Sequence, residues 1–243
     1  MLNWWRKKTP IDTGTPVLID MHSHLLPGLD DGVQSFEDAA AIIRIFQELG
    51  YTKLITTPHV MSDIYRNNTK GILERLHELK LFLKEQQIDM TVEAAAEYYL
   101  DEQLIRLLEK DEQLLTFGDR YLLFETNFLT EPYQLKEFIF LLGVKGYRPV
   151  FAHPERYLYL QRDLTKAEDL IHRDVLFQLN ASSFTGYYSK AAQVTAQQLV
   201  SKGWVHFIGS DCHAINHLDL LKQARKNRYF QKALTLPLLN NTL

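Results

Sequence analysis

The sequence is poor in the features that mark secreted, membrane-spanning and nucleic-acid-binding proteins. It has one cysteine, Cys212, which excludes an internal disulfide and fits a reducing compartment. No segment approaches the roughly 20 apolar residues that span a bilayer, and no apolar stretch follows residues 1–8 to form a signal peptide. The net charge of −3 gives no surplus of cations for nucleic acid. We therefore expect a cytoplasmic protein without a nucleic-acid partner.

The first residues differ in character from the rest. We expect an N-terminal tail over residues 1–16, followed by one domain over residues 17–243. The tail carries Trp4 and Trp5 next to a basic run, which is typical of peptides that touch a membrane interface. Peripheral contact with a membrane, contact with a neighbouring subunit and a frayed terminus are open interpretations. The oligomeric state is not predicted.

Two histidines follow the first apolar run of the chain. Residues 17–20 predict a buried strand, and His22 and His24 come directly after it. Side chains at i and i+2 of a strand point to the same face, so both imidazoles project together. One such histidine is more often a core or loop residue, but the chain repeats the arrangement. Further apolar runs end in His59, Glu97, Glu125, His153 and the pair Asp211 and His213.

Strand-like and helix-like segments alternate along the whole chain. The expected strands are 17–20, 53–57, 91–96, 121–125, 148–152, 176–179 and 205–210. The expected helices are 35–49, 69–87, 102–110, 134–144, 165–173, 190–202 and 218–234. Regular alternation of this kind implies a parallel sheet with right-handed crossovers. About seven units favour closure into a TIM-like barrel, and no Gly-x-Gly-x-x-Gly suggests a dinucleotide site.

The polar residues at the strand ends predict a metal centre. The C-terminal ends of the strands of such a barrel meet at one face, and Asp31 adds a carboxylate from the first loop. So many ligands suit two or three divalent ions that share carboxylates. Such ions lower the pKa of a bound water, which can then act as the nucleophile in hydrolysis. The His and carboxylate set favours Mn, with Fe, Zn or Mg as alternatives. Arg156 can offer a planar fork to a phosphate oxygen, or it can pair with Glu155 or a surface carboxylate.

The motifs, taken together, resemble one protein family. The sequence resembles the PHP (polymerase and histidinol phosphatase) superfamily, and more closely its bacterial protein-tyrosine phosphatases that regulate capsule synthesis. The resemblance runs from about residue 17 to 215. It is carried by the segments Asp20-Met-His-Ser-His24, Leu29-Asp-Asp-Gly32, Thr57-Pro-His59, Ala96-Glu-Tyr-Tyr99, Phe124-Glu125, Ala152-His-Pro-Glu-Arg-Tyr157 and Ser210-Asp-Cys-His213.

The resemblance implies a distorted PHP barrel of about seven strands with a trinuclear metal centre. Arg156 matches the family's phosphate-binding arginine, and the implied substrate is phosphotyrosine in the tail of a bacterial tyrosine kinase that controls capsule or exopolysaccharide synthesis. The sequence departs from the family in one respect: founding members carry a second arginine shortly after the Asp-x-His motif, and this sequence has none there. His217 lies in that stretch and could contact the phosphate, donate a proton or be a surface residue. The implied ligand sets are His22, His24, Glu97 and Asp211 for one ion, Glu97, Glu125 and His153 for a second, and Asp31, His59 and His213 for a third.

The sequence thus predicts a metal-dependent protein-tyrosine phosphatase in which a metal-activated hydroxide attacks phosphorus. No Cys-x5-Arg loop is present, which excludes the cysteine phosphatase mechanism. Asp211 or His217 would protonate the leaving tyrosine oxygen. Tyr98, Tyr99 and Tyr157 would contact the substrate, and the wider set of loop tyrosines, which adds Tyr65, Tyr159, Tyr187 and Tyr188, could stack on its ring or simply pack at the barrel rim. Two alternatives stay open: a PHP phosphatase for a small molecule such as histidinol phosphate, and a non-catalytic module that binds a kinase.

Overall fold

The computed structural model describes residues 14–243, and the Trp4–Trp5 pair lies outside the described residues. All paired strands run parallel, in a three-stranded sheet of order β1-β2-β4 and a six-stranded sheet of order β3-β5-β6-β7-β8-β9. The strands are β1 (Ile19–Asp20), β2 (Lys53–Thr56), β3 (His59–Val60), β4 (Thr91–Ala94), β5 (Glu97–Tyr99), β6 (Tyr121–Glu125), β7 (Arg148–Ala152), β8 (Leu176–Asn180) and β9 (Phe207–Gly209).

The two sheets are parts of one curled, distorted TIM-like structure. The chain passes from β2 to β3 across Thr57 and Pro58 and from β4 to β5 across two alanines, so these expected strands are each broken in two. Proline removes a backbone donor from the ladder, which accounts for the first break. An isolated parallel bridge between Ser23 and Cys212 joins the extension of β1 to the segment after β9. The predicted parallel α/β fold is therefore confirmed.

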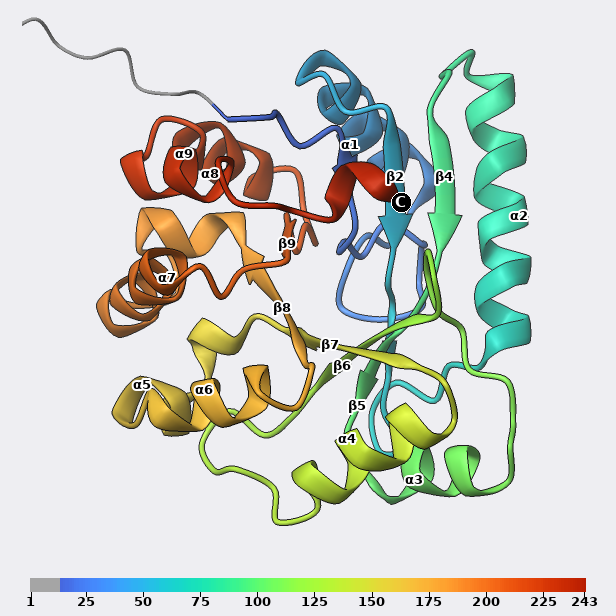
Figure 1. Cartoon of the computed structure of the whole chain (residues 1–243). Coiled ribbons are helices and arrows are strands. Elements are labelled where there is room, and N and C mark those ends of the chain that lie inside the picture. Colours follow the sequence, from blue (N-terminus) through green and yellow to red (C-terminus); the bar gives the residue numbers. More distant parts are fainter. Residues whose placement is uncertain (1–13) are drawn as a thin grey trace, which may run out of the picture.

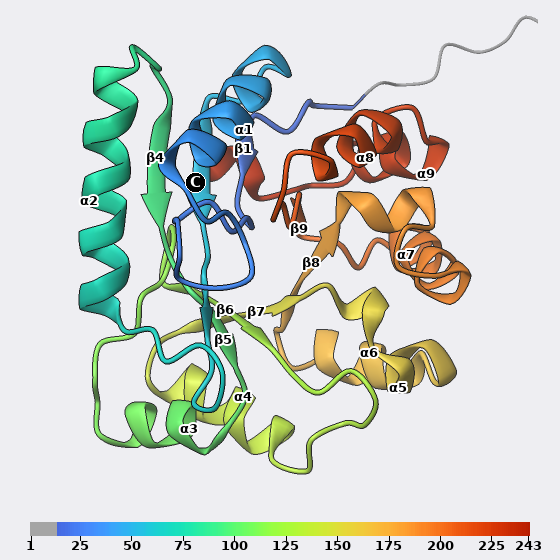
Figure 2. The ribbon, with the colours of Figure 1, turned by 180° about the vertical axis from the view of Figure 1, so that it is seen from behind.

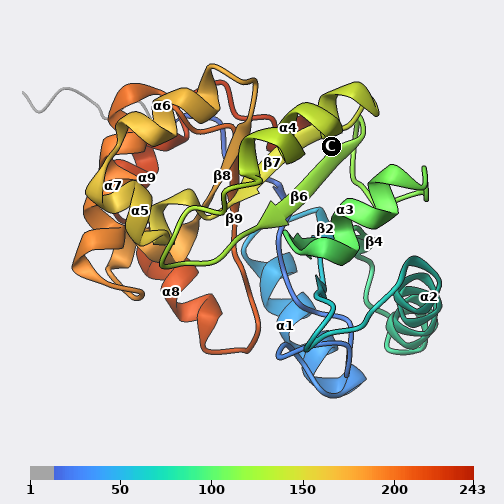
Figure 3. The ribbon, with the colours of Figure 1, turned by 90° about the horizontal axis from the view of Figure 1, so that it is seen from below.

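Helices cover the outer face of the curled sheet, with α2 on one side and α5 to α9 on the other (Figures 1 and 2). Seen from below, they surround the strands (Figure 3). All but α5 form where the sequence predicts a helix, and the short α5 was not predicted. Helix α1, for example, begins after Ser35, whose side chain accepts a hydrogen bond from the Asp38 N–H. The helices are α1 (Phe36–Glu48), α2 (Thr69–Glu85), α3 (Glu102–Glu109), α4 (Leu135–Val144), α5 (Leu158–Arg162), α6 (Thr165–Ile171), α7 (Lys190–Lys202), α8 (His217–Ala224) and α9 (Arg228–Ala233).

Short 3-10 helices η1 (Pro154–Arg156), η2 (Ala181–Thr185) and η3 (Asn240–Thr242) complete the fold. The prediction of one closing helix over 218–234 is wrong. The structure divides it into α8 and α9, because Asn227 adopts an extended backbone and caps α9 by accepting a hydrogen bond from the Tyr229 N–H. Within residues 14–243, the helices all fall short of the length and apolarity needed to cross a bilayer.

The strand alternation divides the apolar residues into two packed layers. On β6, Leu122 and Phe124 belong to the large cluster that includes the helices, whereas Tyr121 and Leu123 belong to a smaller cluster inside the curled sheet. Because side chains alternate along a strand, Glu125 at the end of β6 continues the inner series. The fold therefore points this carboxylate into the interior at the C-terminal ends of the strands.

Candidate metal centre and phosphate-binding pocket

The parallel register places residues from different strands side by side at one end of the sheet. His59 on β3 is the register partner of Glu97 on β5, and Tyr99 is the partner of Glu125 on β6. His22, His24 and Glu97 are fully buried. Polar residues in such a position need partners, because an isolated buried charge is very costly.

The structure brings all the residues predicted as metal ligands into one cluster. Their donor atoms form four overlapping groups, within each of which all atoms lie within 4.8 Å of one another. Glu97, His22, His24 and His59 each belong to two groups, so the groups are contiguous. The groups are His24, Asp31, His59 and His213; His22, His24 and Asp211; His22, Glu97 and His153; and His59, Glu97 and Glu125.

The spacing of the donor atoms fits divalent ions. Ligands about 2.1 Å from one ion lie roughly 3.0 to 3.4 Å apart in octahedral or tetrahedral geometry. Here His22 Nε2 lies 3.0 Å from Glu97 Oε2, and His59 Nδ1 lies 3.3 Å from both Glu97 Oε2 and Glu125 Oε1. His59 Nδ1 is buried and has no hydrogen-bond partner among residues 14–243. The donor set and this unpartnered nitrogen both suit a centre of more than one ion.

Electrostatic coupling within the cluster is strong. Burial opposes a positive charge on His22, but the carboxylates of Glu97 and Asp211 raise its pKa to about 9. Burial likewise opposes ionisation of Glu97, yet the contacts with His22 and His59 hold its pKa well below its ordinary value. Protons on His22 and His24 thus help to balance the carboxylates in the protein alone. Metal binding would replace them and release protons.

Two residues outside the predicted ligand set orient the first two histidines. Asp30 Oδ2 accepts a hydrogen bond from His24 Nδ1 at 2.7 Å, and Gln178 Oε1 accepts one from His22 Nδ1 at 2.8 Å. Each contact fixes the tautomer, so that Nε2 is free to bind an ion. Sequence reasoning missed both residues. A usable signal was the presence of Gln178 in a strand that is otherwise apolar.

Arg156 lies beside the cluster, on the turn after β7. Two residues of the cluster near Arg156 have a left-handed backbone, His153 after β7 with φ 36° and Asp211 after β9 with φ 51°. This conformation is uncommon for residues other than glycine and is typical of functional sites. Arg156 Nη1 donates to Asp211 Oδ2 at 3.2 Å, and its guanidinium lies 4.6 Å from the Phe128 ring centroid and 4.2 Å from that of Tyr188. The expected alternative pairing with Glu155 does not occur, because that carboxylate is buried against Ser183.

A cavity of about 430 Å³ opens over the cluster and gives it access to solvent. Arg156 and His217 both face it. His217 Nδ1 lies 3.3 Å from the backbone N–H of His213, and its Nε2 lies 3.5 Å from the Tyr187 hydroxyl. The lining comprises Asp31, His59, Met61, Glu125, Phe128, His153, Arg156, Tyr187, Tyr188, Asp211, His213 and His217.

The three tyrosines predicted to contact substrate do not line this cavity. Tyr98 is buried and its hydroxyl accepts a hydrogen bond from the Leu115 N–H, whereas Tyr157 is fully buried and stacks on Phe151. Tyr99 is partly exposed but is also outside the lining. Of the wider set of loop tyrosines considered from the sequence, Tyr187 and Tyr188 line the cavity. Which tyrosine faces the site depends on strand register and loop path, which residue type alone does not reveal.

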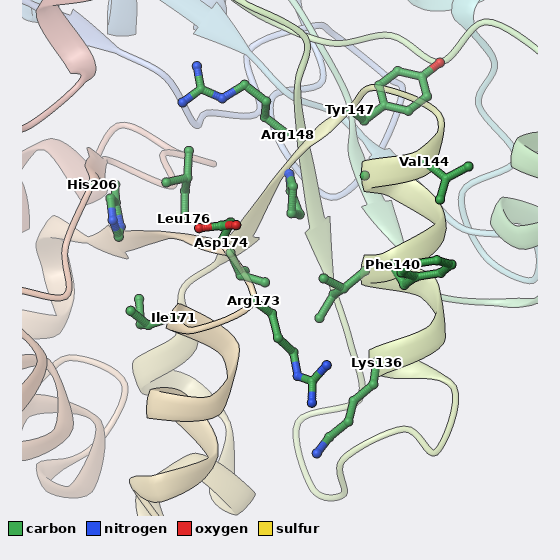
Figure 4. Close-up of a pocket in the computed structure, with 14 residues that line it drawn as sticks. Lys136, Phe140, Val144, Tyr147, Arg148, Ile171, Arg173, Asp174, Leu176 and His206 are labelled. Carbon is green, nitrogen blue, oxygen red and sulfur yellow. The ribbon is translucent and has the colours of Figure 1, made fainter.

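Two other features lie apart from this chemistry. Cys212 is fully buried, and burial raises the pKa of its thiol, so it does not serve as a nucleophile. A larger cavity of about 790 Å³ lies at the opposite ends of the strands, between α4 and the starts of β7 and β8 (Figure 4). It includes Phe140, Val144 and His206 but none of the predicted site residues.

Comparisons with known proteins agree with this geometry. The chain is 26% identical over 204 residues to the tyrosine-protein phosphatase CpsB of Streptococcus pneumoniae, covering 82% of this chain and 84% of that protein. It is 29% identical over 199 residues to the tyrosine-protein phosphatase YwqE of Bacillus subtilis, covering 82% and 78%.

A solved structure from work on YwqE and CpsB, described as metal-dependent tyrosine phosphatases, superposes with a TM-score of 0.76 at 29% identity, covering 88% of this chain and 84% of that one. An amidohydrolase from Mycoplasma synoviae shares the fold alone, with a TM-score of 0.52 at 13% identity and coverage of 96% and 88%. The family model for capsular polysaccharide synthesis, CpsB/CapC, matches residues 18–227. The chain therefore belongs to the CpsB/CapC family.

Proposed function

We propose that this protein is a metal-dependent protein-tyrosine phosphatase, with two or three divalent ions held at the C-terminal ends of its strands. The observation that carries the proposal is the placement of an arginine directly beside a largely buried cluster of nine His, Asp and Glu residues. Relatives of the CpsB/CapC family with the same fold are tyrosine phosphatases, which supports the substrate class. We expect Mn²⁺ at the centre and a cytoplasmic site of action.

The positions of the side chains indicate which residues hold each ion and which residue binds the phosphoryl group. We assign His22, His24, Glu97 and Asp211 to one ion, Glu97, Glu125 and His153 to a second, and Asp31, His59 and His213 to a third. Ions at these residues supply Lewis acidity, which lowers the pKa of a water and neutralises charge on a phosphoryl oxygen. Arg156 binds a further phosphoryl oxygen and stabilises the charge that develops during transfer.

Protonation of the leaving tyrosine oxygen is better assigned to His217 than to Asp211. Asp211 is buried, and contacts with His22, His24 and Arg156 hold its pKa well below its ordinary value despite burial, so it has no proton to give. The His217 Nδ1 lies 3.3 Å from both the His213 N–H and the Asp211 backbone carbonyl, and burial lowers the pKa of the ring. In the protonated ring, Nδ1 would donate to the Asp211 carbonyl and Nε2 would carry the second proton at the cavity. This nitrogen can donate to a phosphoryl oxygen or to the leaving oxygen.

The shape of the cavity favours a phosphotyrosine in a protein over a small phosphomonoester. The lining combines Arg156 with apolar and aromatic residues, and the Tyr187 side chain is half exposed at its mouth. An open aromatic rim can accept a ring that projects from a polypeptide. We propose the tail of a bacterial tyrosine kinase that controls capsule or exopolysaccharide synthesis as the substrate. Histidinol phosphate is the alternative that the same metal cluster could hydrolyse.

A comparison of substrates tests the proposal. Protein stripped with a chelator and reconstituted with Mn²⁺ is assayed on a phosphotyrosine peptide and on histidinol phosphate. We expect turnover of the peptide that requires the metal and falls about 10²-fold or more in Arg156→Ala. Arg162→Ala, at an exposed residue of α5, is the matched control and should retain full activity.

Turnover of histidinol phosphate alone would refute the substrate assignment. A reconstituted protein that binds Mn²⁺ but hydrolyses neither compound would refute the enzymatic proposal and favour a kinase-binding module.

A further inference from the structure

Tyr188 contacts both the phosphate-binding arginine and a metal ligand. It lies between η2 and α7, directly after Tyr187, but the two side chains serve different neighbours. The Tyr187 hydroxyl faces His217, whereas the Tyr188 ring packs against the guanidinium of Arg156, 4.2 Å from its centroid. The centroid of the Phe128 ring lies 4.6 Å from the same guanidinium. Arg156 thus packs against two aromatic rings.

The hydroxyl of Tyr188 makes a second, separate contact. It donates to Asp211 Oδ2 at 2.9 Å, where Asn180 Nδ2 also donates at 2.6 Å and Arg156 Nη1 at 3.2 Å. Three donors therefore occupy one carboxylate oxygen. The other oxygen, Oδ1, lies 3.5 Å from the Nε2 atoms of both His22 and His24. A carboxylate fixed in this way presents a single oxygen to an ion.

We propose that Tyr188 is a positioning residue with two separable effects: its ring directs Arg156 toward the phosphoryl group, and its hydroxyl fixes the carboxylate of Asp211 for metal binding. The inference rests on the proposed function for its substrate. An arginine side chain has many rotamers, and packing it against two rings restricts that freedom before the phosphate arrives. A cation over an aromatic face adds an attraction that water does not fully screen when the group is partly buried.

The two effects predict different kinetic results for two substitutions. Tyr188→Phe keeps the ring and removes the hydroxyl, so we expect Mn²⁺ to bind several-fold more weakly while KM, measured at saturating Mn²⁺, stays near that of the parent protein. Tyr188→Leu also removes the ring, so we expect KM and the dissociation constant of inorganic phosphate to rise about tenfold. Phe128→Leu removes only the other ring and should weaken phosphate binding without changing Mn²⁺ affinity. Tyr133→Leu, at a side chain that is 97% exposed, is the control.

A double-substitution cycle separates an effect through Arg156 from a general loosening of the site. Calorimetry measures inorganic phosphate binding to the Mn²⁺-loaded protein, which does not depend on the identity of the physiological substrate. In an Arg156→Ala background, Tyr188→Leu should change the phosphate dissociation constant by less than about twofold, because the residue through which it acts is absent.

Full additivity in this cycle would overturn the proposed action of the ring, as would unchanged phosphate binding in Tyr188→Leu. Unchanged Mn²⁺ affinity in Tyr188→Phe would overturn the role of the hydroxyl. Failure of every phosphotyrosine peptide as a substrate would instead refute the proposed function, and the phosphate measurements would still decide the role of Tyr188.

Discussion

Replacement of Asp30 by asparagine should weaken metal binding although Asp30 is not itself in the ligand set. The carboxylate is fully buried and makes three hydrogen bonds. Its Oδ2 accepts from His24 Nδ1 at 2.7 Å and from the His59 backbone N–H at 2.9 Å, and its Oδ1 accepts from the Gly32 N–H at 3.0 Å. Burial opposes ionisation of Asp30, but the contact with His24 holds its pKa well below the ordinary value.

The size of the effect follows from these contacts. An asparagine has one carbonyl oxygen, so it can replace Oδ2 only by turning its NH₂ group toward the Gly32 N–H. The buried N–H then loses its acceptor, which costs about 1–3 kcal/mol of stability. The bond to His24 also loses the assistance of a full negative charge, and partners that orient metal ligands typically contribute 10- to 100-fold to metal affinity. That range corresponds to about 1.4–2.7 kcal/mol.

The assay titrates Mn²⁺ into chelator-stripped protein by calorimetry and measures the stability of the metal-free protein by urea unfolding. Asp30→Asn should bind Mn²⁺ 10- to 100-fold more weakly. The control is Asp119→Asn, at a side chain 82% exposed and paired with Arg148 at 3.3 Å, which should leave Mn²⁺ affinity unchanged. A folded Asp30→Asn protein whose Mn²⁺ affinity is within twofold of the parent would refute the reasoning.

Three further predictions concern stability and reactivity. Gly209→Ala should destabilise the protein by about 1–3 kcal/mol in urea unfolding, because the new Cβ would lie 2.7 Å from the Cβ of His22. Gly143→Ala, at a helix position with open space around it, should instead stabilise the protein in the same assay. Burial raises the pKa of Glu155 to about 7. In metal-free protein the free energy of unfolding should therefore fall by up to about 3 kcal/mol between pH 4.5 and 7, and Glu155→Gln should make that fall smaller. An equal fall in both proteins would contradict this reasoning. Cys212 is fully buried, so a thiol reagent should label it only on unfolding, and rapid labelling of native protein would contradict its placement.

The order of strands and helices and the identity of the ligand candidates could be read from the sequence. Apolar runs of strand length that end in His, Asp or Glu depend only on neighbouring residues, and the end of a strand in a parallel barrel has one location. The predicted ligands His59, Glu97 and Glu125 could therefore be expected at one face before any contact was known. The motif resemblance added the family and the role of Arg156.

The surroundings of those ligands depended on the tertiary structure. Sequence reasoning selected Tyr98 and Tyr157 for the substrate, but the fold buries both and places Tyr188 at the cavity. Adjacent tyrosines on one loop face different partners, and nothing in the residue type distinguishes them. Local periodicity also failed to divide the last predicted helix, where a capping residue, Asn227, interrupts it.

The difference has a physical cause. Secondary structure and strand-end chemistry follow from interactions within a few residues of chain, which the sequence displays directly. The contact between Asp211 and Arg156 joins residues 55 apart, and that between His22 and Gln178 joins residues 156 apart. Such partners meet only when the sheet curls and its strands take one register. The sequence therefore determined which groups are candidates to bind metal and phosphate, and the tertiary structure decided which atoms of each group lie at the cavity or against one another.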